Sequence, residues 1–285
     1  MRTVWTISDR DKTLITTTMK NTSNNLVKAA LAACLFAAPS YAGTPVSAKE
    51  PVTIEPEKPF VSGSLSFTVD THFISYGQDV WGAGGNWDDP LFHPQLELNF
   101  DLGGGFTGIL GTWWDVNDNA SSNITNKIQE IDVWAGIAYA TGDWKFTLLY
   151  QEWMYANQSE RIVDFKIAYA NFLNPSLTLH GRVDGAEPFD TGLVTVLGIA
   201  PGKTFGPVSL SLPISVAADT DGFHGGDGGF SYVSAGLAAS VPLSFMKGNW
   251  TLNGSVTYYH TEDSVIPTNP ESDFVTGSLG IALAF

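Results

Sequence analysis

Cysteine, basic residues and long apolar runs are all scarce in this chain of 285 residues. Its single cysteine is Cys34, and 14 lysines and arginines stand against 29 aspartates and glutamates, a formal net charge of −15. An acidic chain repels nucleic acid and attracts cations, so we expect no nucleic-acid partner. No apolar run reaches the roughly 18 residues that a membrane-spanning helix needs.

Glycine and aromatic residues are abundant instead. The chain has 29 glycines and 12% aromatic residues, and only 15% of its residues are charged, against roughly 25% in soluble domains. This composition is typical of neither a helical membrane protein nor a cytosolic protein. The length allows one large domain or two small ones.

The N-terminal residues have the pattern of a secretory signal peptide. Lys20 and Lys28 form a basic front, residues 29–38 are apolar, and a small-x-small cleavage site ends at Ala42. We therefore expect residues 1–42 to be an N-terminal extension and signal peptide that is cleaved after Ala42.

Three further interpretations concern the same end of the chain. Residues 1–18 carry no signal pattern, and we interpret them as the product of an upstream, mis-chosen start codon. Residues 31–34 resemble a lipoprotein cleavage box, which is an alternative interpretation. Cleavage after Ala42 would remove Cys34, so no disulfide would support the fold. Residues 43–60 are rich in proline and lack periodicity, which predicts an extended periplasmic linker.

From Val61 onward, apolar and polar residues alternate with the two-residue period of β-strands. Leu96, Leu98 and Phe100, for example, alternate with polar Gln95, Glu97 and Asn99. Residues 61–285 are therefore predicted to form one all-β domain. Twelve strand-like runs are predicted, at about 61–77, 94–103, 106–117, 127–142, 144–157, 161–173, 176–186, 190–200, 207–219, 230–246, 250–262 and 273–285.

The connections between these runs alternate between short and long. Tight turns rich in Gly, Pro, Asn and Asp lie at 103–105, 141–143, 174–175 and 247–249. Longer acidic loops lie at 78–93, 117–127, 219–229 and 262–273. In an up-and-down barrel this order places the short turns at one end and the long loops at the other, as in bacterial outer-membrane barrels. The connections at 157–161 and 200–207 fit this pattern least.

Alternation alone does not distinguish a membrane barrel from a soluble periplasmic β-protein that binds a ligand. The signal peptide, the loop asymmetry and the aromatic residues favour the membrane barrel, because aromatic belts flank the apolar band of such barrels. The expected belts are Phe106, Trp144, Phe172 and Trp250 beside the short turns, and Tyr76, Trp114, Tyr155 and Tyr259 toward the long loops.

The last predicted strand runs to the final residue. Leu279, Ile281, Leu283 and Phe285 share one face of it, and pairing of this strand with the first would remove both sheet edges. An apolar alternation that ends on an aromatic residue resembles the signal by which outer-membrane assembly machinery recognises its clients. We predict a single up-and-down antiparallel transmembrane β-barrel of about 12 strands in the bacterial outer membrane, with this machinery, lipid and lipopolysaccharide as partners.

Four short motifs mark the predicted barrel. They are Phe73 to Gln78 (FISYGQ), Pro94 to Phe100 (PQLELNF), Gly108 with Trp113 and Trp114, and Glu130 to Asp132. With these motifs the chain resembles a family of uncharacterised proteobacterial proteins predicted to be outer-membrane β-barrels. Many members have an arginine before the glycine, where this chain has Tyr76 before Gly77. The resemblance implies a location and a fold, and no established activity.

Charged residues opposite the apolar stripes would line the barrel interior. They are Asp70, His72, Glu97, Asp101, Glu130, Asp132, Lys145, Asp164, Lys166, His180 and Arg182. Buried charges need partners or water, so the interior is either a water-filled, cation-preferring pore or a salt-bridged filling. Eight-stranded barrels are filled and barrels of 16 or more strands carry channels, so twelve strands leave both interpretations open.

The predicted loops carry many carboxylates. Residues 219–229 slightly resemble a calcium loop with Asp219, Asp221 and Asp227 as candidate ligands, but they lack the spacing and closing glutamate of an EF-hand. Solvated acidic loops are the alternative interpretation. A further hypothesis is that divalent cations bridge these loops to lipopolysaccharide phosphates.

Catalytic motifs are missing from the sequence. There is no GxSxG, HExxH or P-loop, and no serine in a recognisable motif accompanies His72 or His180. We therefore expect a protein without enzymatic activity or cofactor that serves as a porin-like passive channel for small solutes or cations, or as a structural outer-membrane protein. A lipid-modifying barrel enzyme is the alternative, because fold alone does not fix function.

Overall fold

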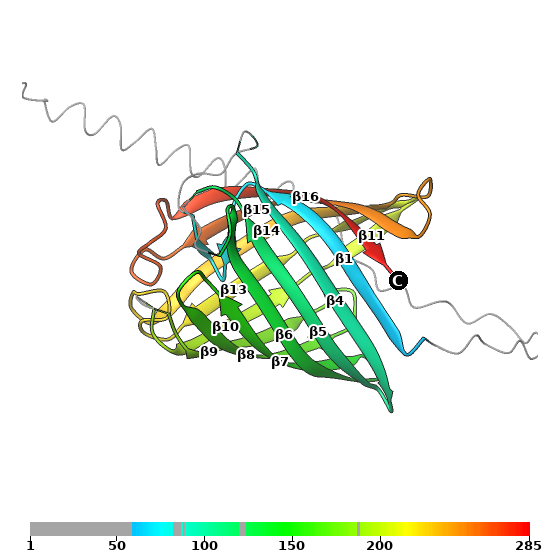
Figure 1. The fold of residues 1–285 in the computed structure, drawn as a ribbon, viewed down its shortest axis with the longest axis horizontal. Coiled ribbons are helices and arrows are strands. Elements are labelled where there is room, and N and C mark those ends of the chain that lie inside the picture. The colour runs from blue at the N-terminus through cyan, green and yellow to red at the C-terminus, as the bar shows by residue number, and fades with distance from the viewer. Residues whose placement is uncertain (1–58, 82–86, 88, 120–123, 187–188) are drawn as a thin grey trace, which may run out of the picture. The chain divides into compact units, whose positions relative to one another are not determined.

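The computed structural model describes residues 59–285, except 82–86, 88, 120–123 and 187–188 (Figure 1). The expected signal peptide and all but the last two residues of the expected linker lie outside the described residues. Within the described part of the chain, no helix is long and apolar enough to cross a bilayer.

The described residues form sixteen β-strands. They are β1 (Val61–Asp70), β2 (Ile74–Ser75), β3 (Gln78–Asp79), β4 (Leu91–Gly103), β5 (Phe106–Val116), β6 (Ile128–Thr141), β7 (Trp144–Met154), β8 (Ser159–Tyr169), β9 (Ser176–Asp184), β10 (Gly192–Ile199), β11 (Gly202–Phe205), β12 (Val208–Ser211), β13 (Ile214–Asp219), β14 (Gly229–Pro242), β15 (Asn249–Thr261) and β16 (Asp273–Ala284). All except β2 and β3 belong to one antiparallel sheet.

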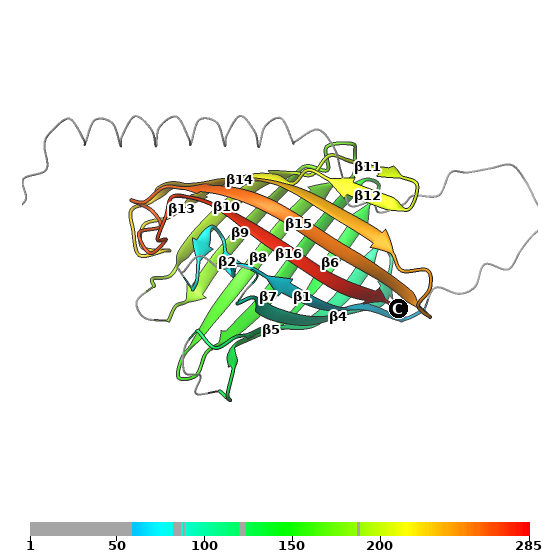
Figure 2. The same ribbon diagram turned by 90° about the horizontal axis from the view of Figure 1, so that it is seen from above.

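This sheet closes on itself into a barrel (Figures 1 and 2). The last strand β16 pairs with the first strand β1, and β15 pairs with both β14 and β16. Strands β12 and β13 pair with successive parts of β14. In the next position of the wall, β11 pairs with β12 and β10 pairs with β13. Strands β10 and β11 therefore count together as one wall strand, as do β12 and β13, which confirms the predicted twelve-stranded antiparallel barrel.

Two prolines explain why these wall strands are broken. Proline has no N–H to donate to a sheet ladder, and Pro201 and Pro213 stand between β10 and β11 and between β12 and β13. Their carbonyls still accept bonds from neighbours, since Leu212 N lies 3.1 Å from Pro201 O and Gly236 N lies 2.8 Å from Pro213 O. The wall therefore stays continuous across both breaks.

The short and long connections lie at opposite ends, as the sequence predicts. Strands β4 and β5, β6 and β7, β11 and β12, and β14 and β15 join at the end where the chain finishes (Figure 1). The opposite end carries the described parts of 71–90, 117–127 and 185–191, together with residues 220–228 and 262–272 and the short connection 155–158. We call these the turn end and the loop end.

Apolar side chains point outward and circle the barrel. Leu148 is 48% exposed and Val256 is 57% exposed, although both lie in the middle of long strands. Exposed apolar residues occur on nearly every wall strand: Leu110, Ile137, Leu148, Val163, Val183, Leu197, Val216, Leu237, Val256 and Leu279. Soluble monomers rarely expose a continuous apolar surface of this size, whereas a barrel in hydrocarbon requires one.

The first predicted strand, 61–77, is too long, because β1 ends at Asp70 and residues 74–79 form the separate hairpin β2–β3. The following strand begins at Leu91 rather than at residue 94. These differences share one cause. The chain leaves the wall at Thr71, whose N and Oγ1 still bond to Gly277, and turns away from it before β4 begins.

The aromatic belts are predicted correctly at the turn end and largely wrongly at the loop end. Phe106, Trp144 and Phe172 are exposed, as is Trp114 near the loops, whereas Trp250 is half-buried. Tyr76 and Tyr259, however, pack against interior groups, and Tyr155 lines an interior cavity. Burial, foremost, raises the pKa of the Tyr155 phenol above its usual value. The error arises because the distance of a residue from a turn predicts its position along the barrel axis. It does not predict whether the side chain of a loop residue points into the barrel or out of it.

The final strand closes the barrel as predicted. Gly63 N donates to Phe285 O at 2.8 Å and Phe285 N donates to Gly63 O at 3.0 Å. Leu279 and Phe285 are both about half exposed on the outer face, with Ile281 and Leu283 between them on the same side of β16. Recognition of this face by assembly machinery stays a prediction.

Candidate functional site

The hairpin β2–β3 is built on a two-residue turn. Ile74 pairs with Asp79 and Ser75 pairs with Gln78, and the two turn residues, Tyr76 and Gly77, have φ of 48° and 93°. Positive φ at both positions is the geometry of a type I′ hairpin turn. This turn lies in the FISYGQ motif and directs the Tyr76 ring into the barrel.

Tyr76 docks on a buried pair of β8 and β9. Its ring stacks on His180 with centroids 3.7 Å apart, and its hydroxyl lies 3.5 Å from Asp164 Oδ2. His180 Nδ1 lies 2.6 Å from the other oxygen of Asp164. Burial first, and the Asp164 charge second, raise the pKa of Tyr76 well above its usual value. The phenol therefore stays neutral at physiological pH and can donate to the carboxylate.

The rest of the hairpin contacts the opposite wall of the interior. A Cβ at Gly77 would lie 2.5 Å from Tyr232 Cδ1, so only glycine fits between the turn and β14. Phe73, just before the hairpin, lies 4.9 Å from Trp113 and 5.7 Å from His93 between ring centroids. The segment 71–80 therefore touches several walls of the barrel at the loop end.

Asn269, in the loop before β16, forms hydrogen bonds with the backbone of this hairpin. Its Oδ1 accepts from Asp79 N at 2.8 Å, and its Nδ2 lies 2.9 Å from Gly77 O and 3.2 Å from Thr261 Oγ1. Gln78 Nε2 also donates to Thr268 Oγ1 at 3.2 Å. Two loops far apart in the sequence thus hold each other across the mouth.

Charged groups below the hairpin are paired and enclosed. Asp164, which is fully buried, also accepts from Gln151 Nε2 at 2.9 Å and faces Lys166 Nζ at 3.5 Å. Arg182 donates to Glu160 at 2.5 Å and to Phe223 O at 2.6 Å, and its guanidinium lies 4.0 Å above the Phe223 ring. Arg182 therefore supports the loop 220–228 from inside the barrel.

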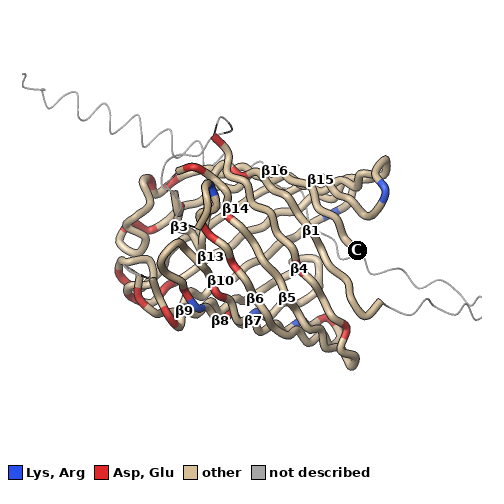
Figure 3. Tube along the Cα trace, in the orientation of Figure 1, with Lys and Arg blue, Asp and Glu red and all other residues tan. Residues whose placement is uncertain are grey.

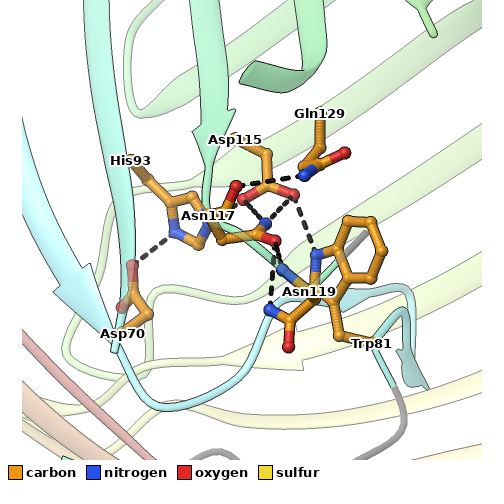
Figure 4. A network of polar contacts seen from close by, with 7 residues as sticks. All are labelled: Asp70, Trp81, His93, Asp115, Asn117, Asn119 and Gln129. Carbon is orange, nitrogen blue, oxygen red and sulfur yellow. Dashed lines mark hydrogen bonds and ion pairs between the residues drawn. The ribbon is translucent and has the colours of Figure 1, made fainter. Parts of the chain in front are cut away.

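A second network joins β1, β4, β5, β6 and two loops at the same end (Figure 4). His93 lies between two carboxylates, with Nδ1 2.6 Å from Asp70 Oδ2 and Nε2 3.2 Å from Asp115 Oδ1. Asp115 also accepts from Trp81 Nε1 at 2.9 Å and from Asn117 Nδ2 at 2.8 Å. Asn117 continues the network to Asn119 and Gln129.

Part of the interior at the loop end is filled. His180, Phe223 and Val194 are almost completely buried, so the salt-bridged filling describes the region around β9, β10 and the loop 220–228. Toward the turn end lies a cavity of about 260 Å³ lined mainly by small residues, among them Ser66, Thr68 and Ser278. Two further cavities of about 320 and 250 Å³ border the segment 71–80.

The predicted interior residues do not form a single site. Asp70, Glu130, Asp132, Asp164, His180 and Arg182 gather at the loop end. Glu97 accepts from Trp134 Nε1 at 3.2 Å and from Asn99. Asp101 accepts a hydrogen bond from Gly103 N at 3.0 Å in the turn after β4. Lys145 lies at the turn end of β7. His72 lies 3.8 Å from Asp79 beside the hairpin.

Acidic residues concentrate at the loop end (Figure 3). Of the three metal candidates, Asp219 lies 2.6 Å from His224 Nδ1 and Asp221 accepts from Gly228 N at 2.6 Å. Among the residues that the structure describes, no three His, Cys, Asp or Glu side chains are arranged to hold a metal ion. Cation bridging from these loops to lipopolysaccharide stays a prediction.

The Asp164–His180 pair resembles a catalytic base with its orienting carboxylate. Its second ring nitrogen, His180 Nε2, has no hydrogen-bond partner within the described residues. The ring is nevertheless enclosed, since Tyr76 and Trp153 stack on it and Phe223 meets its edge. In this conformation the pair is the surface against which Tyr76 packs.

Two kinds of residue at this site are not predicted from the sequence. Trp153 shares a face of β7 with Lys145, and Glu160 shares a face of β8 with Asp164, so alternation could have found both. Trp113 and Asp115 share a face of β5, on which no interior residue was predicted. Tyr76, Phe223, His224 and Asn269 come from loops, and no periodic signal marks a loop residue that folds into the interior.

No family model matches the chain, and no curated protein is detectably similar in sequence. The fold is similar to that of the KdgM porin, with 10% identity over 78% of this chain and 99% of that one and a TM-score of 0.46.

Two further solved structures are similar to a comparable degree. The NanC porin has 8% identity over 77% of this chain and 98% of its own, with a TM-score of 0.47. The translocator domain of the autotransporter NalP from Neisseria meningitidis has 12% identity over 95% and 97%, with a TM-score of 0.42. All three are outer-membrane β-barrel proteins, and the barrel assignment itself rests on the strand pairing described above.

Proposed function

We propose that this protein is a narrow, cation-preferring channel of the bacterial outer membrane, closed in the present conformation by the segment 71–80. The main support for this proposal is that the barrel has an apolar outer belt and an acidic interior, and that a hairpin folded inward obstructs this interior. The apolar belt supports insertion in a membrane, because water would penalise so much exposed apolar surface.

The interior charge supports a preference for cations. Asp70, Asp115, Glu130 and Asp132 face the interior near the hairpin, and Glu97 continues the acidic face toward the turn end. Rings of carboxylates favour cations in channels. The basic groups Arg182 and Lys166 are each within ion-pair distance of a carboxylate, Glu160 and Asp164, and acidic side chains outnumber basic ones in this part of the interior.

The closed state is supported by the way the hairpin is held. Tyr76, Gly77 and Asn269 make specific contacts, and Asn269 contacts two loops at once. Interactions of this kind amount to a few kcal/mol in total, so closure can be stable and still reversible. We assign the loop end to the cell exterior, as in other outer-membrane barrels, and we assign no catalytic step to the chain.

The proposal includes the family and partners expected from the sequence. The FISYGQ motif, by which the chain resembles the uncharacterised proteobacterial barrel family, forms the hairpin itself. Lipid would surround the apolar belt, lipopolysaccharide would meet the acidic loops, with divalent cations between them, and the assembly machinery would read the face of β16 that ends at Phe285. A structural role without conduction is the outcome if no channel activity is found.

Conductance in planar lipid bilayers tests the proposal. The wild-type protein is compared with a variant in which residues 73–80 are replaced by a glycine-serine linker of equal length. We expect rare, small openings from the wild type, and frequent, larger openings with a reversal potential that favours potassium over chloride from the variant.

The control for this experiment is a variant in which the turn 243–248, at the opposite end, receives the same kind of linker. This control variant, with a glycine-serine linker as long as the turn that it replaces, should keep the wild-type conductance. A gel shift on boiling would show that each variant is folded. A hairpin variant that is as silent as the wild type, or that prefers anions, would contradict the proposal.

A further inference from the structure

A cavity of about 320 Å³ lies directly beneath the hairpin, between β5, β6 and β7 on one side and β14 and β15 on the other. Its volume is at the lower limit of those of small-molecule sites. Its floor and sides combine carboxylates with large aromatic rings, and residues Phe73–Gly77 form its roof.

One carboxylate of this cavity stands between two indoles. Asp132 on β6 is paired across the ladder with Trp113 on β5 and with Trp153 on β7. Directly paired residues of neighbouring antiparallel strands have side chains about 5 Å apart on one face. The three side chains therefore form a row with a carboxyl group at its centre and an aromatic ring on each side.

No basic side chain of the cavity pairs with its carboxyl groups. Asp132 Oδ1 is buried and has no hydrogen-bond partner among the described residues, while Glu130, which is 4% exposed, shares a side-chain hydrogen bond with Asp132. None of the eleven described residues that line the cavity is basic. Two imidazoles contact rings that line the cavity, His93 at Trp113 and His180 at Trp153 and Tyr76. Each imidazole has carboxylates of its own, with His93 beside Asp70 and Asp115 and His180 beside Asp164.

The opposite wall adds two further rings. Tyr232 and Tyr259 line the cavity from β14 and β15, with their ring centroids 6.1 Å apart. A cation surrounded by aromatic faces is attracted by their quadrupoles, and the attraction is strongest when the cation has lost its water. An aromatic-walled cavity with a carboxylate fits an organic cation better than a strongly hydrated metal ion, which needs several oxygen ligands.

We propose that this cavity binds small alkylammonium ions, with Asp132 supplying the charge and Trp113, Trp153, Tyr232 and Tyr259 supplying aromatic contacts. The inference deepens the proposed cation channel and rests on it for the passage of the ligand. Binding itself requires only the cavity, so it can be measured without transport. The bound cation would lie under Phe73 and Tyr76, at the point where the hairpin obstructs the interior.

Isothermal titration calorimetry on the full chain in a maltoside detergent tests this inference, since detergents with choline-like head groups would compete. Choline and the diamine putrescine are the cationic probes, and 3,3-dimethylbutan-1-ol is a neutral probe with the shape of choline. We expect saturable binding of at least one cationic probe and none of the neutral alcohol.

Two variants with matched controls locate the binding. Asp132→Asn removes the charge at nearly constant shape, and Asp118→Asn removes an exposed loop carboxylate from the same end of the barrel. Trp113→Leu removes a cavity ring, and Trp114→Leu removes the next residue, which is exposed on the outer face. The two cavity variants should weaken binding about tenfold or more, as loss of a desolvated cation contact implies, and the two controls should bind like the wild type.

Absence of saturable cation binding by the folded wild type would overturn the inference, as would equal binding of the neutral alcohol or undiminished binding by Asp132→Asn. These results are separable from failure of the channel proposal. Conductance without choline or putrescine binding would contradict the alkylammonium site and leave the channel proposal standing. Binding without any conductance in the hairpin-replaced variant would contradict the channel proposal and leave the binding site standing.

Discussion

At the scale of single residues, Tyr76 and Gly77 determine how the hairpin enters the barrel. Both have positive φ, which L-residues other than Asn and Asp seldom adopt. The cost of holding Tyr76 in this conformation is offset by its stacking on His180 and its contact with Asp164. The FISYGQ motif is thus explained by backbone and packing requirements of one turn.

Gly77→Ala should loosen the hairpin. The new methyl group would meet the Tyr232 ring and would also carry the strain of φ near 93°, a combined cost of about 1–3 kcal/mol. Hydrogen exchange of the segment 71–80 should accelerate by at least about fivefold. Gly103→Ala is the control, because φ is 77° there and open space surrounds the added group. Equal acceleration near both sites would show that strain alone, and not the contact with Tyr232, decides the effect.

The phenol of Tyr76 predicts an alkaline limit to closure. Its folded-state pKa is raised above the usual value of 10 by burial and by Asp164 on β8, with Tyr232 on β14 adding to the effect and His180 on β9 stacked against the ring. The neutral phenol therefore stabilises docking fully below about pH 10, and this contribution is lost as the pH rises through the folded-state pKa. Channel openings should become frequent only above about pH 10.

Tyr76→Phe separates this effect from the titration of lysines in the same range. The phenylalanine keeps the ring stack and has no proton to lose, so its openings should not respond to alkaline pH in this way. A variant that opens at the same pH as the wild type would assign the alkaline response to other groups.

At the scale of elements, closure depends on two loops that hold each other. Asn269, between β15 and β16, contacts the backbone of the β2–β3 hairpin at Gly77 and Asp79. Arg182 on β9 supports the loop 220–228, and the network around Asp115 anchors the residues after β5. The loop end is therefore a filled layer built from several loops, supported by wall residues.

Asn269→Ala should release the hairpin without disturbing the barrel wall. It removes contacts to Asp79 N, Gly77 O and Thr261 Oγ1, each with a net contribution of about 0.5–1.5 kcal/mol. We expect single-channel open probability to rise by about tenfold or more. Asn253→Ala is the matched control, because Asn253 faces the turn-end cavity and bonds only to Thr251 among its side-chain contacts in the described structure. Unchanged gating of Asn269→Ala would mean that the hairpin is not the gate.

The sequence predicts the wall of this barrel better than its contents. Alternation gives the strand number, the outward apolar faces and the inward positions of Glu130, Asp164 and His180, because a strand has only two sides. It does not give the path of residues 71–80, because a loop has no period and its direction depends on contacts distant in sequence. Asn269 lies 192 residues from Gly77, and no local pattern connects them.

At the scale of the whole molecule, the barrel is a closed ring with an apolar outside and a polar inside. Cross-strand partners such as Ile137 and Leu148 place apolar groups side by side on the exterior. Every strand of the wall pairs on both edges except β11, which pairs with β12 alone. All backbone groups of the wall can then be satisfied within the ring, which is the condition for crossing hydrocarbon. The interior charges are tolerated because the same ring shields them from lipid.

A charge on the outer belt should therefore cost more than one on the inner face. Leu148→Arg places a guanidinium in the bilayer and should lower the free energy of unfolding by about 2–4 kcal/mol. Thr147→Arg, one residue away, directs the charge to the interior and should cost less. Urea unfolding in lipid vesicles, followed by tryptophan fluorescence, measures the difference. A larger cost for Thr147→Arg would place the apolar stripe of β7 away from lipid.

The most direct test of the account is spin-label accessibility along β7, residues 145–152, in lipid vesicles. Cysteines are introduced singly after replacing Cys34 by serine, and collisions with oxygen, which enters lipid, are compared with those of a water-soluble nickel chelate. The account predicts oxygen accessibility with a period of two, high at Phe146, Leu148 and Tyr150 and low at Thr147, Leu149 and Gln151. Nickel accessibility at Phe146, Leu148 and Tyr150, with oxygen favouring the alternate positions, would contradict it.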